Sequence, residues 1–211
     1  MVKIAPPPPI NSPSPIIYEL SVDDYIIRIF DPTKYQTQAL TFRYYGPISR
    51  FDHHRGSLNN PQNDSERGIY YAAFTLSGCL VECFGDTGVI EIKDQCVAQV
   101  QLTRTIKLLD LRGSAAMKAG SVAALAKDAD RKLTQTWSRY FYEQDSIYSV
   151  VDGIIYYNAH NDEKAVALFE RAKSALFCPP EQVIRLDDPE LTAGIEEAAL
   201  NNNLIIQPYT K

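Results

Sequence analysis

Arg28, Arg50 and Glu82 are the charged residues whose settings are least typical of an ordinary protein surface. Arg28 interrupts the apolar run Tyr25–Phe30, Arg50 lies in a segment rich in Gly, Pro, Asn, Asp and His, and Glu82 falls within the largely apolar stretch 75–84. A guanidinium is planar and permanently charged, so it can bind several phosphate oxygens at once. A carboxylate can stabilise positive charge that develops in a reaction, or can orient a nucleophile. These three residues are therefore candidates for a catalytic and anion-binding site.

Two aromatic residues accompany these charges. Phe51 follows Arg50 directly, and Tyr71 precedes the stretch that contains Glu82. A flat aromatic face that stacks on a ligand ring contributes roughly 0.5–1.5 kcal/mol beyond its burial. Tyr70 competes with Tyr71 for this role, because adjacent residues of a strand face opposite sides.

The elements that must position these side chains follow from apolar patterning. Residues 75–84 and 189–201 fit helices, and residues 114–144 show helical spacing with a break at Gly120. Apolar or alternating runs predict strands at residues 25–30, 68–74, 96–102, 106–111, 149–157, 165–171 and 183–186. The two strands on either side of Arg104 are expected to form a hairpin. Strands and helices mix without a regular βαβ rhythm, which favours an α+β fold with a mixed sheet core flanked by helices.

Two segments do not fit regular elements. Residues 44–67 have neither helical nor strand periodicity, so we expect a long loop, and long loops within compact domains are often functional. Residues 6–15 contain six prolines in ten positions, a composition that favours an extended polyproline conformation. We therefore divide the chain into a proline-rich arm, residues 1–17, and one domain, residues 18–211.

The order of these segments resembles the RES-domain family. The family's early arginine matches Arg28, its GRF-like turn matches Arg50 with Phe51, and its strand leading to a helix with a glutamate matches Tyr71 and Glu82. A later DGIxYxS-like segment and an ALF-like strand match residues 152–158 and 167–169, which read DGIIYYN and ALF. The resemblance runs from residue 25 to residue 169 and arguably to the C-terminus. Asn158 stands where the family commonly carries serine, and it keeps one donor group and one acceptor.

The resemblance implies an ADP-ribosyltransferase-like fold and a toxin that consumes NAD+ as substrate, without a resident cofactor. Cleavage of the nicotinamide–ribose bond develops oxocarbenium-like charge, which Glu82 would stabilise. Arg28 and Arg50 would bind the diphosphate, Phe51 and Tyr71 would stack on a ring, and Asn158 would contact the ligand. The implied partner is a cognate antitoxin with a helix-turn-helix domain.

Three functions stay open from the sequence. The first is an NAD+ glycohydrolase or a phosphorylase, the latter with phosphate as co-substrate. The second is transfer of ADP-ribose to a protein side chain, and the third is a noncatalytic nucleotide-binding or interaction module. Individual residues also have structural alternatives: Arg28 could close a buried ion pair, Glu82 could be solvated or salt-bridged, and Asn158 could stabilise the turn before His160.

Composition narrows the class of protein. A formal net charge of -5 opposes nonspecific nucleic-acid binding, and no apolar run approaches the roughly 20 residues that cross a membrane. No secretory signal is apparent, so we expect a cytoplasmic protein with its four cysteines reduced. The adjacent His53 and His54 lack the spacing of a metal site, so no metal is expected. A homo-oligomer is compatible with the sequence.

Overall fold

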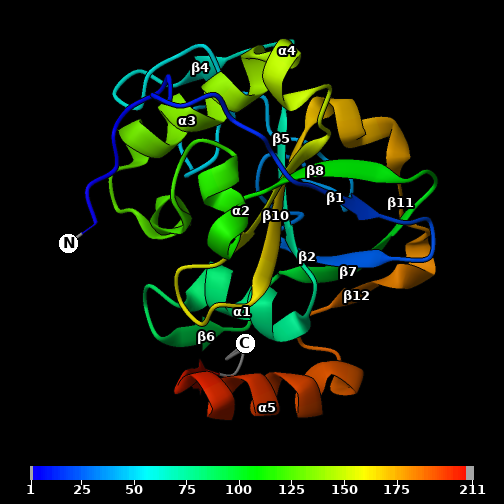
Figure 1. Cartoon of the computed structure of the whole chain (residues 1–211). Coiled ribbons are helices and arrows are strands. Elements are labelled where there is room, and N and C mark those ends of the chain that lie inside the picture. Colours follow the sequence, from blue (N-terminus) through cyan, green and yellow to red (C-terminus); the bar gives the residue numbers. More distant parts are fainter. Residues whose placement is uncertain (1, 208–211) are drawn as a thin grey trace.

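A curled, mixed β-sheet forms the centre of the computed structural model, which describes residues 2–207 (Figure 1). In this described range the main sheet has nine strands, in the order β1-β8-β9-β10-β5-β2-β7-β11, and β12 also pairs with β7. These strands are β1 (Ile17–Leu20), β2 (Tyr25–Phe30), β5 (Ile69–Ala73), β7 (Cys96–Leu102), β8 (Ile106–Asp110), β9 (Gly153–Tyr157), β10 (Lys164–Phe169), β11 (Leu176–Phe177) and β12 (Val183–Arg185). Two small sheets pair β3 (Tyr45–Gly46) with β4 (Gln62–Asn63), and β6 (Val89–Glu91) with β13 (Ile205–Gln207).

Side chains of the central strands alternate between two apolar cores, as a period of two requires. Ile154 and Tyr156 of β9 enter one core, whereas Ile155 enters the other. Ala167 of β10 faces the first core and Val166 the second. Both faces of the sheet are therefore buried, which explains the nearly continuous apolar runs in these strands. β8 and β9 run parallel and the other pairs of the main sheet run antiparallel, so the predicted mixed sheet is confirmed.

The α-helices pack on one face of the curled sheet, and no α-helical residue of the described range enters the apolar core on the other face (Figure 1). The α-helices are α1 (Leu76–Phe84), α2 (Gly113–Lys118), α3 (Arg131–Glu143), α4 (Asp145–Tyr148) and α5 (Thr192–Asn202). Short 3-10 helices are η1 (Ala123–Lys127), η2 (Glu170–Ala175), η3 (Pro180–Gln182) and η4 (Pro189–Leu191). Residues of α2, η1 and α3 pack on β8, β9 and β10, and α1 packs with α5 in a third apolar cluster. None of the helices in the described range has the length and apolar character that crossing a membrane requires.

The predicted hairpin of residues 96–102 and 106–111 is wrong. β7 pairs with β2, whereas β8 lies between β1 and β9 on the other side of the sheet. The turn between β7 and β8 is bound to the residue that precedes β9, since the Arg104 guanidinium donates to Asp152 at 2.7 Å and 3.1 Å. Asp152 also accepts from the backbone of Lys107 at 2.9 Å. These bonds direct the chain from β7 toward β9, a partner that lies about 45 residues further along the chain.

The proline-rich segment lies extended along α2 and α3 before the chain enters β1 (Figure 1). The indole Nε1 of Trp137 donates to the carbonyl of Ala5 at 2.9 Å, and the backbone N–H of Ser14 donates to Lys118 at 2.8 Å. Ile4 packs on the core cluster that contains Trp137. The arm thus contributes to the cover of this core.

Candidate functional site

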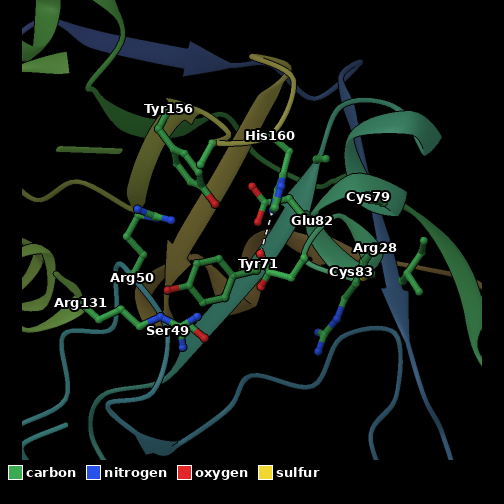
Figure 2. A pocket seen from close by; sticks show the side chains of 15 residues that line it. Arg28, Ser49, Arg50, Tyr71, Cys79, Glu82, Cys83, Arg131, Tyr156 and His160 are labelled. Carbon is green, nitrogen blue, oxygen red and sulfur yellow. Dashed lines mark ion pairs between the residues drawn. The ribbon is translucent and has the colours of Figure 1, made fainter. Parts of the chain in front are cut away.

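Residues of six separate segments line a pocket of about 430 Å³ beside α1 (Figure 2). The segments are β2, the loop that contains Arg50, β5, α1, the start of α3, and β9 with the turn after it. Four sequence-predicted site residues line this pocket: Arg28, Arg50, Tyr71 and Glu82. They are separated by as many as 54 residues in the sequence, so the fold has brought them together.

Glu82 occupies the last turn of α1, and the local sequence fixes where that helix begins. Thr75 caps the N-terminus, its hydroxyl accepting from the backbone N–H of Gly78 at 2.9 Å, as N-cap residues do. A Cβ on Gly78 would lie 3.1 Å from the Cβ of Ala73, so glycine permits the close approach of α1 to β5. The helix therefore starts directly after β5 and carries Glu82 to the pocket.

The Glu82 carboxylate makes no hydrogen bond or ion pair with any residue in the range 2–207. Its side chain is accessible to solvent through the open pocket, but neighbouring atoms displace much of its water. Burial raises the pKa of Glu82, while His160 and Arg50 act in the opposite direction and Asp86 adds to the rise. An accessible carboxyl with a perturbed pKa in a pocket is typical of a functional group.

Arg50 lies on a loop that the buried carboxylate of Asp52 holds together. Asp52 accepts from the backbone N–H groups of Ile48 and Ser49 at 2.6 Å and 2.9 Å, and Arg43 binds both of its oxygens at 2.8 Å and 2.9 Å. Arg50 itself donates one N–H to the carbonyl of Asp128. A guanidinium has five N–H groups, so Arg50 keeps donors for a ligand.

Tyr71, and not Tyr70, faces the pocket. The Tyr71 hydroxyl donates to Asp52 at 2.9 Å and accepts from the backbone N–H of Phe51 at 2.9 Å. Burial, together with Asp52, raises the pKa of Tyr71 well above its usual range, so the hydroxyl stays protonated. Tyr70 points to the opposite core and donates to Ala39 at 2.9 Å.

Arg28 lines the pocket edge without an acidic partner in the described part of the chain. Its guanidinium donates to the carbonyl of Thr41 at 2.7 Å and lies 4.3 Å from the centre of the Tyr70 ring. The structure therefore does not place Arg28 in a buried ion pair, the structural alternative for this residue. Cys83 lies near Arg28 in the pocket, but burial raises the pKa of its thiol to about 12, which disfavours a thiolate nucleophile.

Two sequence-predicted ligand-binding residues lie outside the pocket lining. Phe51 is 0% exposed and packs on Tyr156 with ring centres 4.8 Å apart. Asn158 is also 0% exposed, and its side-chain oxygen accepts from the backbone N–H groups of His160 and Asn161 at 3.0 Å and 2.9 Å. Both side chains contact residues that line the pocket without lining it themselves. Asn158 stabilises the turn before His160, which is the structural role that the sequence offered as an alternative to ligand binding.

Four further charged or aromatic residues line the pocket that the sequence-based site did not include: Asp86, Arg131, Tyr156 and His160. Tyr156 belongs to the DGIIYYN segment and alternates with its neighbours in β9, so its orientation had a local signal. In the sequence, His160 is notable only as the residue after the turn that Asn158 could stabilise, and Arg131 has no distinguishing signal. Within residues 2–207, no group of three or more His, Cys, Asp or Glu residues is arranged to hold a metal ion.

Comparisons with known proteins agree with this architecture. The family model of the RES domain matches residues 25–191. Among solved structures, the chain is similar to one from the crystal structure of the M. tuberculosis MbcT–MbcA toxin–antitoxin complex, with a TM-score of 0.55 and 13% sequence identity. That match covers 86% of this chain and 92% of the other. A search of curated proteins finds no significant match. The structural likeness confirms the expected α+β fold with a mixed sheet core flanked by helices.

Proposed function

Because the chain belongs to the RES-domain family, we propose that it is a toxin enzyme that consumes NAD+ by cleaving the bond between nicotinamide and ribose. The observation that carries this proposal is the charge arrangement of the pocket. The unpaired carboxylate of Glu82 faces the same space as the guanidinium groups of Arg50 and Arg131, with Tyr71 between them (Figure 2). NAD+ has the complementary arrangement: a cationic nicotinamide ribose at one end and an anionic diphosphate in the middle.

Glu82 would act at the ribose. When the N-glycosidic bond breaks, its electron pair leaves with nicotinamide, which becomes neutral, and positive charge spreads over C1′ and the ring oxygen. A carboxylate beside that carbon lowers the barrier, because its interaction with the positive charge is stronger in the transition state than in the ground state. Water or phosphate then adds to C1′ and loses a proton, giving ADP-ribose or its 1-phosphate. Glu82 could orient this nucleophile.

Arginine side chains would bind the diphosphate. Arg50 and Arg131 approach each other across the loop of residues 48–50, where Arg131 donates to the carbonyl of Ile48 at 3.3 Å. Arg28 adds a third guanidinium at the other side of Glu82 (Figure 2). Each of them makes only one or two bonds within the described residues, which leaves N–H groups for phosphate oxygens.

Two tyrosines would position the rings. Tyr71 and Tyr156 come from β5 and β9 and both line the pocket on the side of the sheet that faces α3. Asp52 fixes Tyr71 through its hydroxyl, whereas the Tyr156 hydroxyl makes no hydrogen bond within residues 2–207. A fixed tyrosine suits stacking, and a hydroxyl free to rotate suits a bond to a ligand.

An enzyme that depletes NAD+ would harm the cell that makes it, so we also propose a cognate antitoxin with a helix-turn-helix domain. The similar solved chain was crystallised as a toxin–antitoxin complex. Expression of this chain alone should arrest growth and lower cellular NAD+, and the arrest should disappear with Glu82→Gln.

The direct test measures nicotinamide release from NAD+ by the purified protein, with and without phosphate. Glu82→Gln should reduce the rate roughly 100-fold or more. Glu181→Gln makes the same chemical change at an exposed residue of η3 outside the pocket and should leave the rate unchanged. Loss of NAD+ only with phosphate indicates a phosphorylase, and loss in both buffers indicates a glycohydrolase.

Two results would contradict the proposal. Equal rates for the wild type and Glu82→Gln would remove Glu82 from the reaction. Absence of any turnover, with or without candidate protein acceptors, would favour a binding module. Labelled protein bands in place of free ADP-ribose would instead indicate transfer to a protein side chain.

A further inference from the structure

His160 lies beside α1 on a turn that side-chain hydrogen bonds of neighbouring residues hold in place. The turn joins β9 to β10, and Asn158 closes it by accepting from the backbone of both His160 and Asn161. Asn161 donates to Glu163 at 2.7 Å and to Asn202 of α5 at 2.8 Å. The backbone of His160 therefore has a fixed position, which does not depend on its own side chain.

The imidazole lies against the C-terminal end of α1. A Cβ on Gly85 would lie 2.7 Å from Nδ1 of His160, so the ring packs directly on the backbone of the helix end. Nε2 lies 3.8 Å from the carboxylate of Asp86, and the His160 side chain is 29% exposed. In Figure 2 the imidazole and the Glu82 side chain point into the same part of the pocket.

We propose that His160 is a positioning residue for Glu82: its positive charge, placed between two carboxylates at the end of α1, keeps Glu82 ionised and separate from Asp86. This inference rests on the proposed role of Glu82 in NAD+ cleavage. A positive charge at this place would interact favourably with the partial negative charge of the helix C-terminus and with the carboxylates of Glu82 and Asp86.

The charges around Glu82 explain why such a residue is needed. Burial disfavours the Glu82 carboxylate, and Asp86, which lies two positions after the last residue of α1, adds like-charge repulsion. His160 opposes both effects more strongly than Arg50 does. The ionisable groups that line the pocket around Glu82 are Cys79 and Cys83 on α1, Asp86 just after α1, Arg28 on β2, Arg50 on the loop, Tyr71 on β5, Tyr156 on β9, Arg131 on α3 and His160 on the turn.

His160 is better suited to this role than the arginines. Arg50 donates to the Asp128 carbonyl, Arg28 donates to Thr41, and both are needed for the diphosphate in the proposed reaction. Loss of His160 would remove the largest charge effect that lowers the Glu82 pKa. The carboxyl would then stay protonated to a higher pH, and the acid limb of the activity profile would move upward.

The experiment follows the Glu82 carboxyl carbon by NMR as a function of pH, in full-length protein. We expect His160→Gln and His160→Asn to raise the titration midpoint of Glu82 by about half a unit to one unit, a modest value because the pair is partly solvated. His160→Lys should restore the midpoint because it restores the charge. Asp86→Asn should lower the midpoint, since it removes a like charge.

The same variants are then assayed for NAD+ cleavage across pH. The neutral variants should move the acid limb upward by the same amount and leave the rate at high pH unchanged. An unchanged Glu82 midpoint in both neutral variants would overturn the inference, and so would an equal rise in His160→Lys, because packing and not charge would then be the cause. The NMR result stands whether or not NAD+ is cleaved, so failure here is distinct from failure of the proposed function.

Discussion

Asp52 shows how one buried carboxylate organises this pocket at the scale of single residues. It is 0% exposed, yet a guanidinium, a hydroxyl and two backbone N–H groups satisfy its oxygens. A buried charge is tolerated only when it is paired in this way. Since Asp52 also holds Tyr71 and the loop of Arg50, the pocket depends on a residue that contacts no ligand in the proposed reaction.

Tyr71→Phe tests this dependence. The change leaves the ring but removes the partner of both Asp52 and the Phe51 N–H, so we expect a loss of about 1–3 kcal/mol in the free energy of unfolding. The KM for NAD+ should rise because the loop of Arg50 loses an anchor. Urea denaturation and steady-state kinetics measure the two effects.

Tyr70→Phe is the matched control for this change. It also removes a hydroxyl, which donates to Ala39 on the opposite face of β5, and it keeps the ring that Arg28 contacts. Stability should fall while KM stays the same. A KM that rises equally in both variants would mean that Tyr71 has no special link to the pocket.

At the scale of elements, Glu163 joins three segments that must keep their relative positions. Its carboxylate accepts from Thr75 and Ser77 at the start of α1 and from Asn161 in the turn of His160. Ser77 in turn accepts from Asn202 of α5 at 3.1 Å. Helix α1, which bears Glu82, and the turn that bears His160 are therefore fixed to each other by one polar cluster.

Glu163→Gln should change how the free energy of unfolding depends on pH, because the Glu163 carboxylate holds this cluster together. Burial raises the pKa of Glu163, but the hydrogen bonds from Ser77, Thr75 and Asn161 outweigh it, so the pKa in the folded protein is lowered. A lowered pKa stabilises the fold above the pKa of the unfolded chain, and the effect is lost as pH falls through the lower folded value. Wild type should exceed Glu163→Gln in stability by about 1–2 kcal/mol near pH 7, and less near pH 3.

Urea denaturation at both pH values measures this difference. Glu181→Gln serves as the control, because Glu181 is exposed and accepts no hydrogen bond in the described range. A Glu163→Gln deficit that stays constant across pH would show that charge on Glu163 plays no part.

At the scale of the whole molecule, the proline-rich arm completes a core without touching the pocket. Trp137, the single tryptophan, is 2% exposed and binds the carbonyl of Ala5. Proline also limits the freedom of the unfolded arm, which reduces the entropy lost when the arm docks. The arm thus acts as a part of the folded domain and not as a free tail.

Removal of residues 2–13 should uncover Trp137. We expect its fluorescence to shift to longer wavelength and the free energy of unfolding to fall by about 1–3 kcal/mol, in proportion to the apolar area uncovered. Nicotinamide release should persist below the new unfolding temperature, because the arm lines none of the pocket. The full-length variant Ile10→Ser changes a 99% exposed side chain and should alter neither property. An unshifted emission spectrum would show that the arm does not cover Trp137.

The sequence by itself determined the elements whose pattern is local. The run Tyr25–Phe30 became β2 with the same bounds, residues 96–102 became β7, and Thr75 began the helix of Glu82. Period and capping are properties of neighbouring residues, so they can be read without knowing the fold. The ordered set of motifs likewise pointed to the RES family and to Arg28, Arg50, Tyr71 and Glu82, which all line one pocket.

Only the tertiary structure decided which side chains face that pocket and which strands pair. The side chains of Phe51 and Asn158 are buried: Phe51 packs on the Tyr156 ring, and Asn158 accepts a hydrogen bond from the backbone of His160. β7 and β8 do not pair with each other, and the turn between them is bound to a distant residue, since Arg104 donates to Asp152. His160 and Arg131 line the pocket although no neighbouring residue marks either side chain as part of a site. Contacts between distant residues decide these outcomes, and such contacts exist only once the chain has folded.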